Sequence, residues 1–544
     1  MKSYRWLILS IISCLILASG AAFWSNTLIN SIYAYRSPLH NHPPAPGKPL
    51  GNPLSHRVVF ILVDALREDT SLKSDVMPFL NELRQKGAWA TMHSRPPSYS
   101  EPGYTVLLTG AWPDVSDGPT INLDYANIPT FTQDDLVSAI HRAGMKTAIS
   151  GYYWFEKLVP QSSVDTSFYT PGEDMKADTE VVNAAMPWFE DEKYQFFLIH
   201  LDQVDYAGHH EGGPIDPRWN AAASRVDNMI REIASTLDLT QDTLFICSDH
   251  GQIDRGGHGG QDPTTLIEPF VLVGAGVKPG HYSDTYMVDV APTLAALLGA
   301  NIPASSQGHV RTEMLMLNPD QLNIINIALE AQQSQILSAY QSAIGQNKAV
   351  QPANDIVSSY QSALDAARAA RLDTERLPRL ILALIIVCLP AGVLILKRGR
   401  EVAWLLVGAV LYLIIFNFRY AVLDHRTYSL SSVTGASDLI FYCVSTAGIA
   451  QVIAWLLVLI GLRTYRRKIL QASELSLGLT FTTIYLLFIP VMYSFWLNGA
   501  IVTWTLPDFA SSFLAFLSLI QILLISIIGL LLAVLSGLIT KLPR

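Results

Sequence analysis

Residues 243–251 of this chain have the sequence TLFICSDHG, and this stretch decides the expected fold. Its first six residues are mostly apolar and predict a buried strand of a parallel sheet. Asp249 and His250 follow at once, at the carboxyl edge where open α/β sheets bind ligands. Residues 58–64, VVFILVD, repeat the pattern and place Asp64 directly after a second buried strand. The sequence therefore predicts an α/β domain with polar side chains gathered at one sheet edge.

A third predicted strand, residues 195–201 (QFFLIHL), is also followed by side chains that can bind metal. Asp205 and His209 are four residues apart, so one turn of helix would present both on the same face. Asp202 and His210 compete with them for the same role.

His258 lies within the sequence GGHGG at residues 256–260. A histidine among four glycines has no core to pack into, and glycines let the backbone approach another group closely. Imidazoles and carboxylates without thiolates suit Zn²⁺, with Mn²⁺ as the alternative. Two ions about 3.5–4 Å apart can hold both oxygens of an in-line displacement. The pattern therefore predicts two divalent metal ions, most simply zinc.

A hydroxyl nucleophile is expected from residues 95–110, RPPSYSEPGYTVLLTG. The prolines indicate a loop, and a helix is predicted to begin at Tyr104. Ser98, Ser100 and Thr105 are the chemical candidates. Ser100 is preferred and Ser98 is the runner-up, because a hydroxyl just before a helix can place a phosphoryl group at the positive N-terminal end. Coordination to a metal would activate such a hydroxyl without a neighbouring base.

These ordered motifs resemble the alkaline phosphatase superfamily. The similarity is to its nucleotide pyrophosphatase/phosphodiesterase branch and to the glycosylphosphatidylinositol (GPI) ethanolamine-phosphate transferases, over roughly residues 55–310. The resemblance implies an alkaline-phosphatase-like α/β sandwich, mainly a parallel sheet with helices on both faces. It also implies the metal ligands. One zinc would be bound by Asp64, Ser100, Asp249 and His250, and the other by Asp205, His209 and His258.

The resemblance further implies that Ser100 attacks phosphorus and carries a covalent intermediate. In the phosphodiesterase branch an asparagine that touches a phosphoryl oxygen follows the proline of the nucleophile loop. Gly103 occupies this phosphate-binding position here, as in the anchor-transferase type, which weakens the expectation of a nucleotide substrate. Tyr104 replaces the arginine of the sulfatase motif, so sulfate ester hydrolysis is disfavoured.

Half of the residues are hydrophobic, which is high for a soluble protein. An apolar run from Trp6 to Phe23 predicts a transmembrane anchor rather than a cleaved signal peptide. Five further stretches are long enough to cross a bilayer, at about 379–396, 402–422, 438–462, 475–497 and 512–540.

Loop charges predict the orientation of these spans. By the positive-inside rule, four basic clusters are cytoplasmic. They are Lys2 and Arg5; Lys397, Arg398 and Arg400; Arg463, Arg466, Arg467 and Lys468; and Lys541 with Arg544. Both termini would then be cytoplasmic, and residues 25–375 would lie on the extracytoplasmic side of the cell membrane.

The predicted domains follow from these patterns. They are an anchor (1–24), a Pro-rich linker (25–54), a catalytic domain (55–318), a helical connector (319–376) and a five-span transmembrane domain (377–544). The net charge of −9 argues against nucleic-acid binding. The four cysteines give no disulfide framework, and the oligomeric state stays open.

The first hypothesis is a membrane-bound phosphotransferase that moves a phosphoethanolamine-type group from a lipid donor to a glycan or glycolipid. The alternatives are a phosphodiesterase or nucleotide pyrophosphatase, and an inactive membrane scaffold, which the full set of candidate ligands disfavours. Ionisable residues at membrane level are often functional. We therefore expect one polar cluster to line a lipid headgroup path: Asn417, Arg419, Asp424, His425 and Arg426.

Overall fold

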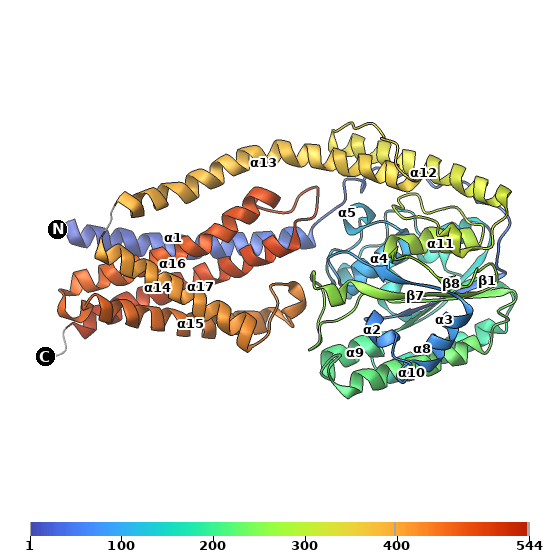
Figure 1. Cartoon of the computed structure of the whole chain (residues 1–544), viewed down its shortest axis with the longest axis horizontal. Coiled ribbons are helices and arrows are strands. Elements are labelled where there is room, and N and C mark those ends of the chain that lie inside the picture. The colour runs from blue at the N-terminus through green and yellow to red at the C-terminus, as the bar shows by residue number, and fades with distance from the viewer. Residues whose placement is uncertain (1, 397–398, 541–544) are drawn as a thin grey trace. The chain divides into compact units, whose positions relative to one another are not determined.

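The computed structural model describes residues 2–396 and 399–540, and it divides into two compact units. The sheet unit comprises Tyr33–Leu372 and Thr503–Leu506. The helical unit comprises Met1–Ile32, Asp373–Val502 and Pro507–Arg544. Each unit has its own arrangement of elements (Figure 1).

A mixed, mostly parallel sheet forms the centre of the sheet unit, with strand order β4-β3-β5-β1-β6-β7-β2-β8. Strand β1 (Arg57–Val63) pairs in parallel with both β5 (Tyr194–Leu201) and β6 (Asp242–Cys247), so the three predicted strands are neighbours. Strand β7 runs antiparallel to β6 and β2. The remaining bounds are β2 (Ala88–His93), β3 (Lys146–Tyr152), β4 (Thr166–Thr170), β7 (Ile267–Gly274), β8 (Gly280–His281) and β9 (Thr285–Tyr286).

Alternate residues of β1 enter two different cores, one on each face of the sheet. Phe60 and Leu62 pack into one core, whereas Ile61 and Val63 pack into the other. Every residue of β1 is buried, as expected for a strand covered on both faces. This arrangement confirms the predicted α/β sandwich.

Helices cover each face of the sheet (Figure 1). One face carries α4 (Ser100–Thr109), α6 (Leu136–Arg142) and α11 (Val290–Leu297). The other carries α3 (Pro78–Lys86), α8 (Met175–Phe189) and α10 (Pro217–Ala234). Shorter helices are α2 (Glu68–Ser71), α5 (Pro113–Ser116), α7 (Trp154–Leu158) and α9 (Gln203–His210), and α12 (Pro319–Ile344) is longer.

Among the described residues, six helices are long and apolar enough to cross a membrane. They are α1 (Lys2–Tyr33), α13 (Ile356–Leu396), α14 (Arg400–Asn417), α15 (Ala436–Gly461), α16 (Ile469–Asn498) and α17 (Phe509–Ile539). These helices indicate a multi-pass membrane protein. Four residues of the predicted basic clusters lie outside the described residues: Lys397, Arg398, Lys541 and Arg544.

Helix α1 continues through residues 25–33, which were expected to belong to the linker. Neither proline nor glycine occurs between Gly20 and Pro38. Leu28 and Ile32 are four residues apart and both buried, so they lie on the same face of this helix. Their packing stabilises the helical conformation of residues 25–33.

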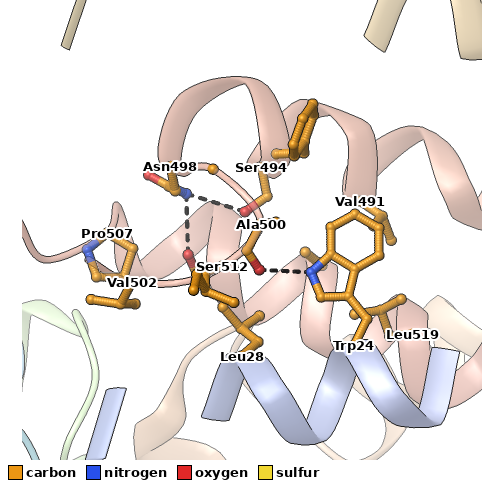
Figure 2. Close-up of a pocket in the computed structure, with 14 residues that line it drawn as sticks. Trp24, Leu28, Val491, Ser494, Asn498, Ala500, Val502, Pro507, Ser512 and Leu519 are labelled. Atoms are coloured by element: carbon orange, nitrogen blue, oxygen red, sulfur yellow. Dashed lines mark hydrogen bonds between the residues drawn. The ribbon is translucent and has the colours of Figure 1, made fainter. Parts of the chain in front are cut away.

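A small pocket of the helical unit shows how α1 is held (Figure 2). The indole nitrogen of Trp24 donates a hydrogen bond to the carbonyl of Ala500 at 2.7 Å. Asn498 donates to Ser494 and Ser512, each at 3.1 Å. These bonds tie together α1, α16, α17 and the turn between the last two helices.

Candidate metal centre

The predicted ligands converge at the carboxyl ends of neighbouring strands. Asp64 follows β1, and Asp249 and His250 follow β6, while β5 leads into α9 with Asp205 and His209. His258 comes from the loop between β6 and β7. Because β5, β1 and β6 are adjacent and parallel, their ends meet at one edge of the sheet.

Asp64, Asp249 and His250 form one group, with one potential ligand atom from each lying within 4.8 Å of the others. The Nε2 of His250 lies 3.4 Å from Oδ1 of Asp64 and 3.4 Å from Oδ2 of Asp249. It also lies 3.2 Å from the Oγ of Ser100. The structure thus brings together all four ligands expected for one metal.

Asp205, His250 and His258 form a second group by the same 4.8 Å criterion. The Nε2 of His258 lies 3.5 Å from Oδ1 of Asp205 and 2.9 Å from the Nε2 of His209. The Nε2 of His209 lies 3.4 Å from Oδ2 of Asp205. The rings of His250 and His258 stack with their centroids 3.9 Å apart, so the two groups are contiguous.

Backbone carbonyls orient both of these stacked imidazoles. The Nδ1 of His250 donates to the carbonyl of Gly251 at 3.0 Å, and that of His258 donates to Ser98 at 2.9 Å. Each Nε2 is therefore left as an unprotonated acceptor that faces the centre. Hydrogen bonds of this kind fix the tautomer and the ring orientation of metal-binding histidines.

The three candidate nucleophiles have different surroundings. Ser98 donates to the carbonyl of Gly260 at 3.0 Å and accepts the N–H of Gly259 at 3.0 Å, so it holds the glycine-rich loop. Thr105 donates to the carbonyl of Glu101 within its own helix at 2.8 Å. The hydroxyl of Ser100 alone among the three contacts His250. The geometry therefore supports Ser100 as the nucleophile.

Helix α4 begins at Ser100 rather than at Tyr104, so this serine lies in the first helical turn. Pro102 is compatible with that position because the first turn needs no N–H bond there. Gly103 lies against the metal group, since a Cβ on this residue would come within 2.8 Å of the Cβ of Asp249. A residue larger than glycine would displace the Asp249 backbone.

Electrostatics favour bound cations at this edge. Burial, followed by repulsion from neighbouring carboxylates, raises the pKa of Asp64 and of Asp249 well above the usual value. Oδ1 of Asp64 and Oδ2 of Asp249 are buried and accept no hydrogen bond from the described residues. Divalent ions would neutralise this charge and satisfy these oxygens. The donors present, imidazole nitrogens and carboxylate oxygens, fit zinc or manganese.

Two residues that support Asp64 were not predicted. Tyr104 donates a hydrogen bond to Oδ2 of Asp64. The Nε2 of His200 lies 2.9 Å from the Tyr104 hydroxyl and 3.1 Å from the same Oδ2. One indication of the role of His200 was present in the sequence, namely that it is a polar residue near the end of an otherwise apolar buried strand.

Two further side chains lie beside the site. Asp202, which competed with Asp205, joins a third group with Asp64 and His200. Asn122 accepts the N–H of Glu101 at 3.1 Å, one residue from Ser100. His210, by contrast, is exposed and contacts Tyr206.

The sequence of this chain is similar to one protein family and to two curated transferases. Residues 58–117 and 121–264 match the family described as type I phosphodiesterase / nucleotide pyrophosphatase. Over 276 residues the chain is 28% identical to GPI ethanolamine phosphate transferase 2, catalytic subunit, of Homo sapiens, covering 47% of this chain and 28% of that protein. Over 313 residues it is 27% identical to GPI ethanolamine phosphate transferase 2 of Aspergillus fumigatus, covering 52% and 40%.

Among solved structures, human ectonucleotide pyrophosphatase / phosphodiesterase 5 aligns with a TM-score of 0.38 and 15% identity, over 45% of this chain and 95% of that one. The matches to the family model and to the two transferases confirm the predicted resemblance to the phosphodiesterase and ethanolamine-phosphate transferase branches. The chain covers 28% and 40% of the length of the two transferases compared. Similarity over this part of their length does not show that the chain has their activity.

Proposed function

We propose that this protein is a membrane-bound, metal-dependent phosphotransferase. It moves a phosphoethanolamine-type group from a lipid donor to a glycan or glycolipid acceptor, with Ser100 as the nucleophile. The observation that carries this proposal is the position of the Ser100 hydroxyl, 3.2 Å from the Nε2 of His250 and at the first turn of α4. The similarity to GPI ethanolamine phosphate transferases supports the choice of group.

Two sets of residues would hold the metal ions. Asp64, Asp249 and His250 would bind one ion together with Ser100, and Asp205, His209 and His258 would bind the other. When bound, two divalent ions supply positive charge that lowers the pKa of the serine hydroxyl and stabilises the phosphoryl oxygens. The Ser98 and Gly251 carbonyls keep the two stacked imidazoles in the required tautomer.

The reaction proposed for Ser100 has two balanced steps. In the first, a bond forms between Oγ and phosphorus while the bond to the lipid oxygen breaks, and the lipid alcohol leaves with the proton lost by the serine. In the second, an acceptor hydroxyl attacks phosphorus, the bond to Oγ breaks, and the acceptor proton returns to Ser100. Covalent catalysis of this kind divides one difficult displacement into two easier ones.

Hydrolysis is the second candidate function, favoured by the match of residues 58–117 and 121–264 to a phosphodiesterase family. It differs only in the second step, in which water takes the place of the acceptor hydroxyl. A membrane setting for the donor fits the six apolar helices. We further propose that the sheet unit faces the extracytoplasmic side, on the basis of the basic loop clusters.

A vesicle assay tests this function. The full chain is placed in phosphatidylcholine vesicles that contain acyl-labelled phosphatidylethanolamine, with an alkyl glycoside as acceptor. Labelled diacylglycerol reports the first step, and the product ratio of phosphoethanolamine-glycoside to free phosphoethanolamine separates transfer from hydrolysis. Ser100→Ala should abolish release of diacylglycerol, whereas Ser98→Ala serves as the neighbouring serine control. Release that survives in Ser100→Ala would exclude the proposed nucleophile.

A further inference from the structure

Two carboxylates beside the metal centre are outside the set of predicted metal ligands. Asp202 lies at the end of β5, and Glu173 lies in the turn between β4 and α8. An oxygen of Asp202 lies within 4.8 Å of both an Asp64 oxygen and a His200 nitrogen. Asp202 is 7% exposed. Within residues 2–396 and 399–540, the Asp202 carboxylate forms no hydrogen bond. Neither Asp202 nor Glu173 forms an ion pair with a lysine or an arginine among these residues.

One of these carboxylates has a hydrogen-bond donor and the other has none among the described residues. Glu173 accepts a hydrogen bond from the hydroxyl of Tyr152 at 2.7 Å. The Nδ1 of His200 is buried and has no hydrogen-bond partner among the described residues. A buried carboxylate is costly unless an opposite charge or a hydrogen-bond donor compensates it. The Asp202 carboxylate therefore lies buried in this corner without a hydrogen-bond donor among the described residues.

Aromatic rings adjoin this corner, since the Tyr152 ring lies 6.4 Å from the ring of His200. The Tyr152 ring packs edge-on against Trp154 at 4.9 Å and against Tyr153 at 4.8 Å. Tyr153 stacks on Tyr125 at 4.5 Å. Tyr153, Trp154 and Tyr125 are only partly buried, and the Nζ of Lys157 lies 4.8 Å from the centre of the Tyr125 ring. Aromatic faces combined with carboxylates are a typical environment for an organic ammonium group.

We propose that Asp202, Glu173 and Tyr152 form a subsite for the primary ammonium of the transferred group. This inference rests on the proposed function, and it assigns the residues that select the headgroup. Asp64 belongs both to the first metal group and to the group with Asp202, so the two sites share one carboxylate. The nitrogen of a phosphoethanolamine ester lies about 5 Å from phosphorus by standard bond lengths. Short contacts connect Ser100 to this corner: Ser100 lies 3.2 Å from His250, His250 lies 3.4 Å from Asp64, and an oxygen of Asp64 lies within 4.8 Å of an oxygen of Asp202.

The chemistry of the subsite favours a primary ammonium over a quaternary one. An ammonium has three N–H donors, and the two carboxylates and the tyrosine oxygen offer three acceptors. A trimethylammonium group has no donor and would leave the Asp202 carboxylate without a hydrogen bond. Choline-type headgroups should therefore be poor substrates compared with ethanolamine-type headgroups.

Soluble esters test the subsite in the full-length protein. The substrates are the p-nitrophenyl esters of phosphoethanolamine, phosphocholine and ethyl phosphate, which share a leaving group and differ only in the headgroup. The wild type should have kcat/KM about 10- to 100-fold higher for the ethanolamine ester than for the ethyl ester, the range expected for a charged hydrogen bond. Glu173→Gln and Asp202→Asn should reduce this ratio towards one. Glu82→Gln, which changes a carboxylate on α3 that pairs with Lys86, should retain the ratio.

Three results would overturn the inference. One is a wild type with no preference among the esters. Another is a variant that loses activity on all esters equally, since that is the behaviour of a structural residue. The third is a fall in metal content in Asp202→Asn and a wild type with three ions per chain, which would make this corner a metal site. Failure of the phosphoryl chemistry proposed for Ser100 gives a different result, because no ester would then be cleaved by the wild type or by any variant.

Discussion

The phenol of Tyr104 donates a hydrogen bond to Oδ2 of Asp64, and this contact leaves Oδ1 of Asp64 to face His250. His200 closes the arrangement, with its Nε2 2.9 Å from the Tyr104 hydroxyl. Tyr104 and His200 are both almost completely buried. The residue that replaces the sulfatase arginine thus holds a predicted metal ligand in place.

Tyr104→Phe should weaken metal binding by about 10- to 100-fold, because residues that orient metal ligands have effects of this size. A chelator-competition titration of the purified protein measures the affinity without depending on turnover. Tyr169→Phe is the matched control, since its hydroxyl binds Gln161 away from the metal groups. Unchanged affinity in Tyr104→Phe would show that Asp64 needs no such support.

Metal removal should destabilise the sheet unit. Without cations, the carboxylates of Asp64 and Asp249 repel each other in a buried site. Rebinding at a hundredfold excess over Kd should add about 2.7 kcal/mol per site to the free energy of unfolding. Thermal melts after chelation and after return of Zn²⁺ measure this effect. A melting temperature that is the same with and without metal would contradict it.

Gly103→Ala should lower phosphodiester cleavage strongly while the protein still folds. The new Cβ would lie 2.8 Å from the Cβ of Asp249 and 2.9 Å from its carbonyl oxygen, so a metal-binding segment must shift. Gly47→Ala is the control because a Cβ there meets nothing within 4 Å. Activity assays and melting curves on both variants separate the local effect from unfolding. Full activity in Gly103→Ala would show that the contact is unimportant.

Asp135 should make stability depend on pH. Burial raises its pKa to about 6, against the opposing effect of its hydrogen bonds with Ser138 at the start of α6. A raised carboxyl pKa stabilises the fold below the unfolded pKa of about 4, and this stability is lost as pH rises through 6. The loss is about 3 kcal/mol for a shift of about two units.

Asp135→Asn removes this charge and keeps an oxygen that can accept the Ser138 N–H. The melting temperature of the variant minus that of the wild type should therefore rise between pH 4 and pH 7. Asp124→Asn, at an exposed position, provides the control. A difference that is constant over this range would contradict the assignment.

The charged residues predicted to line a lipid path pair with one another and with α15. Arg426 lies 4.3 Å above the Tyr442 ring and 3.0 Å from Asp438, and Tyr442 donates to Asp424 at 2.8 Å. We predict that Asp424→Ala lowers cleavage of a lipid donor severalfold more than cleavage of a soluble p-nitrophenyl ester. An equal effect on both substrates, or no effect on either, would contradict the prediction that these residues line a lipid headgroup path.

The sequence predicted those parts of the site that depend on one strand and the residues after it. Asp64, Asp249 and His250 each follow a buried apolar run, so their place at the sheet edge needed only the strand periodicity. The role of His200 could not be predicted this way, because it depends on β5 lying next to β1, which is a property of strand order. The start of α4 was placed late because Pro102 and Gly103 indicate a loop, although both are tolerated in this first turn.

Peptide mass spectrometry of Ser100 tests the central claim most directly. The purified protein is incubated with vesicles that contain phosphatidylethanolamine, without an acceptor, and is then digested. We predict a phosphoethanolamine adduct on the peptide that carries Ser100, absent from Ser100→Ala and present in Ser98→Ala. An unmodified Ser100 together with diacylglycerol release by Ser100→Ala would contradict the covalent mechanism.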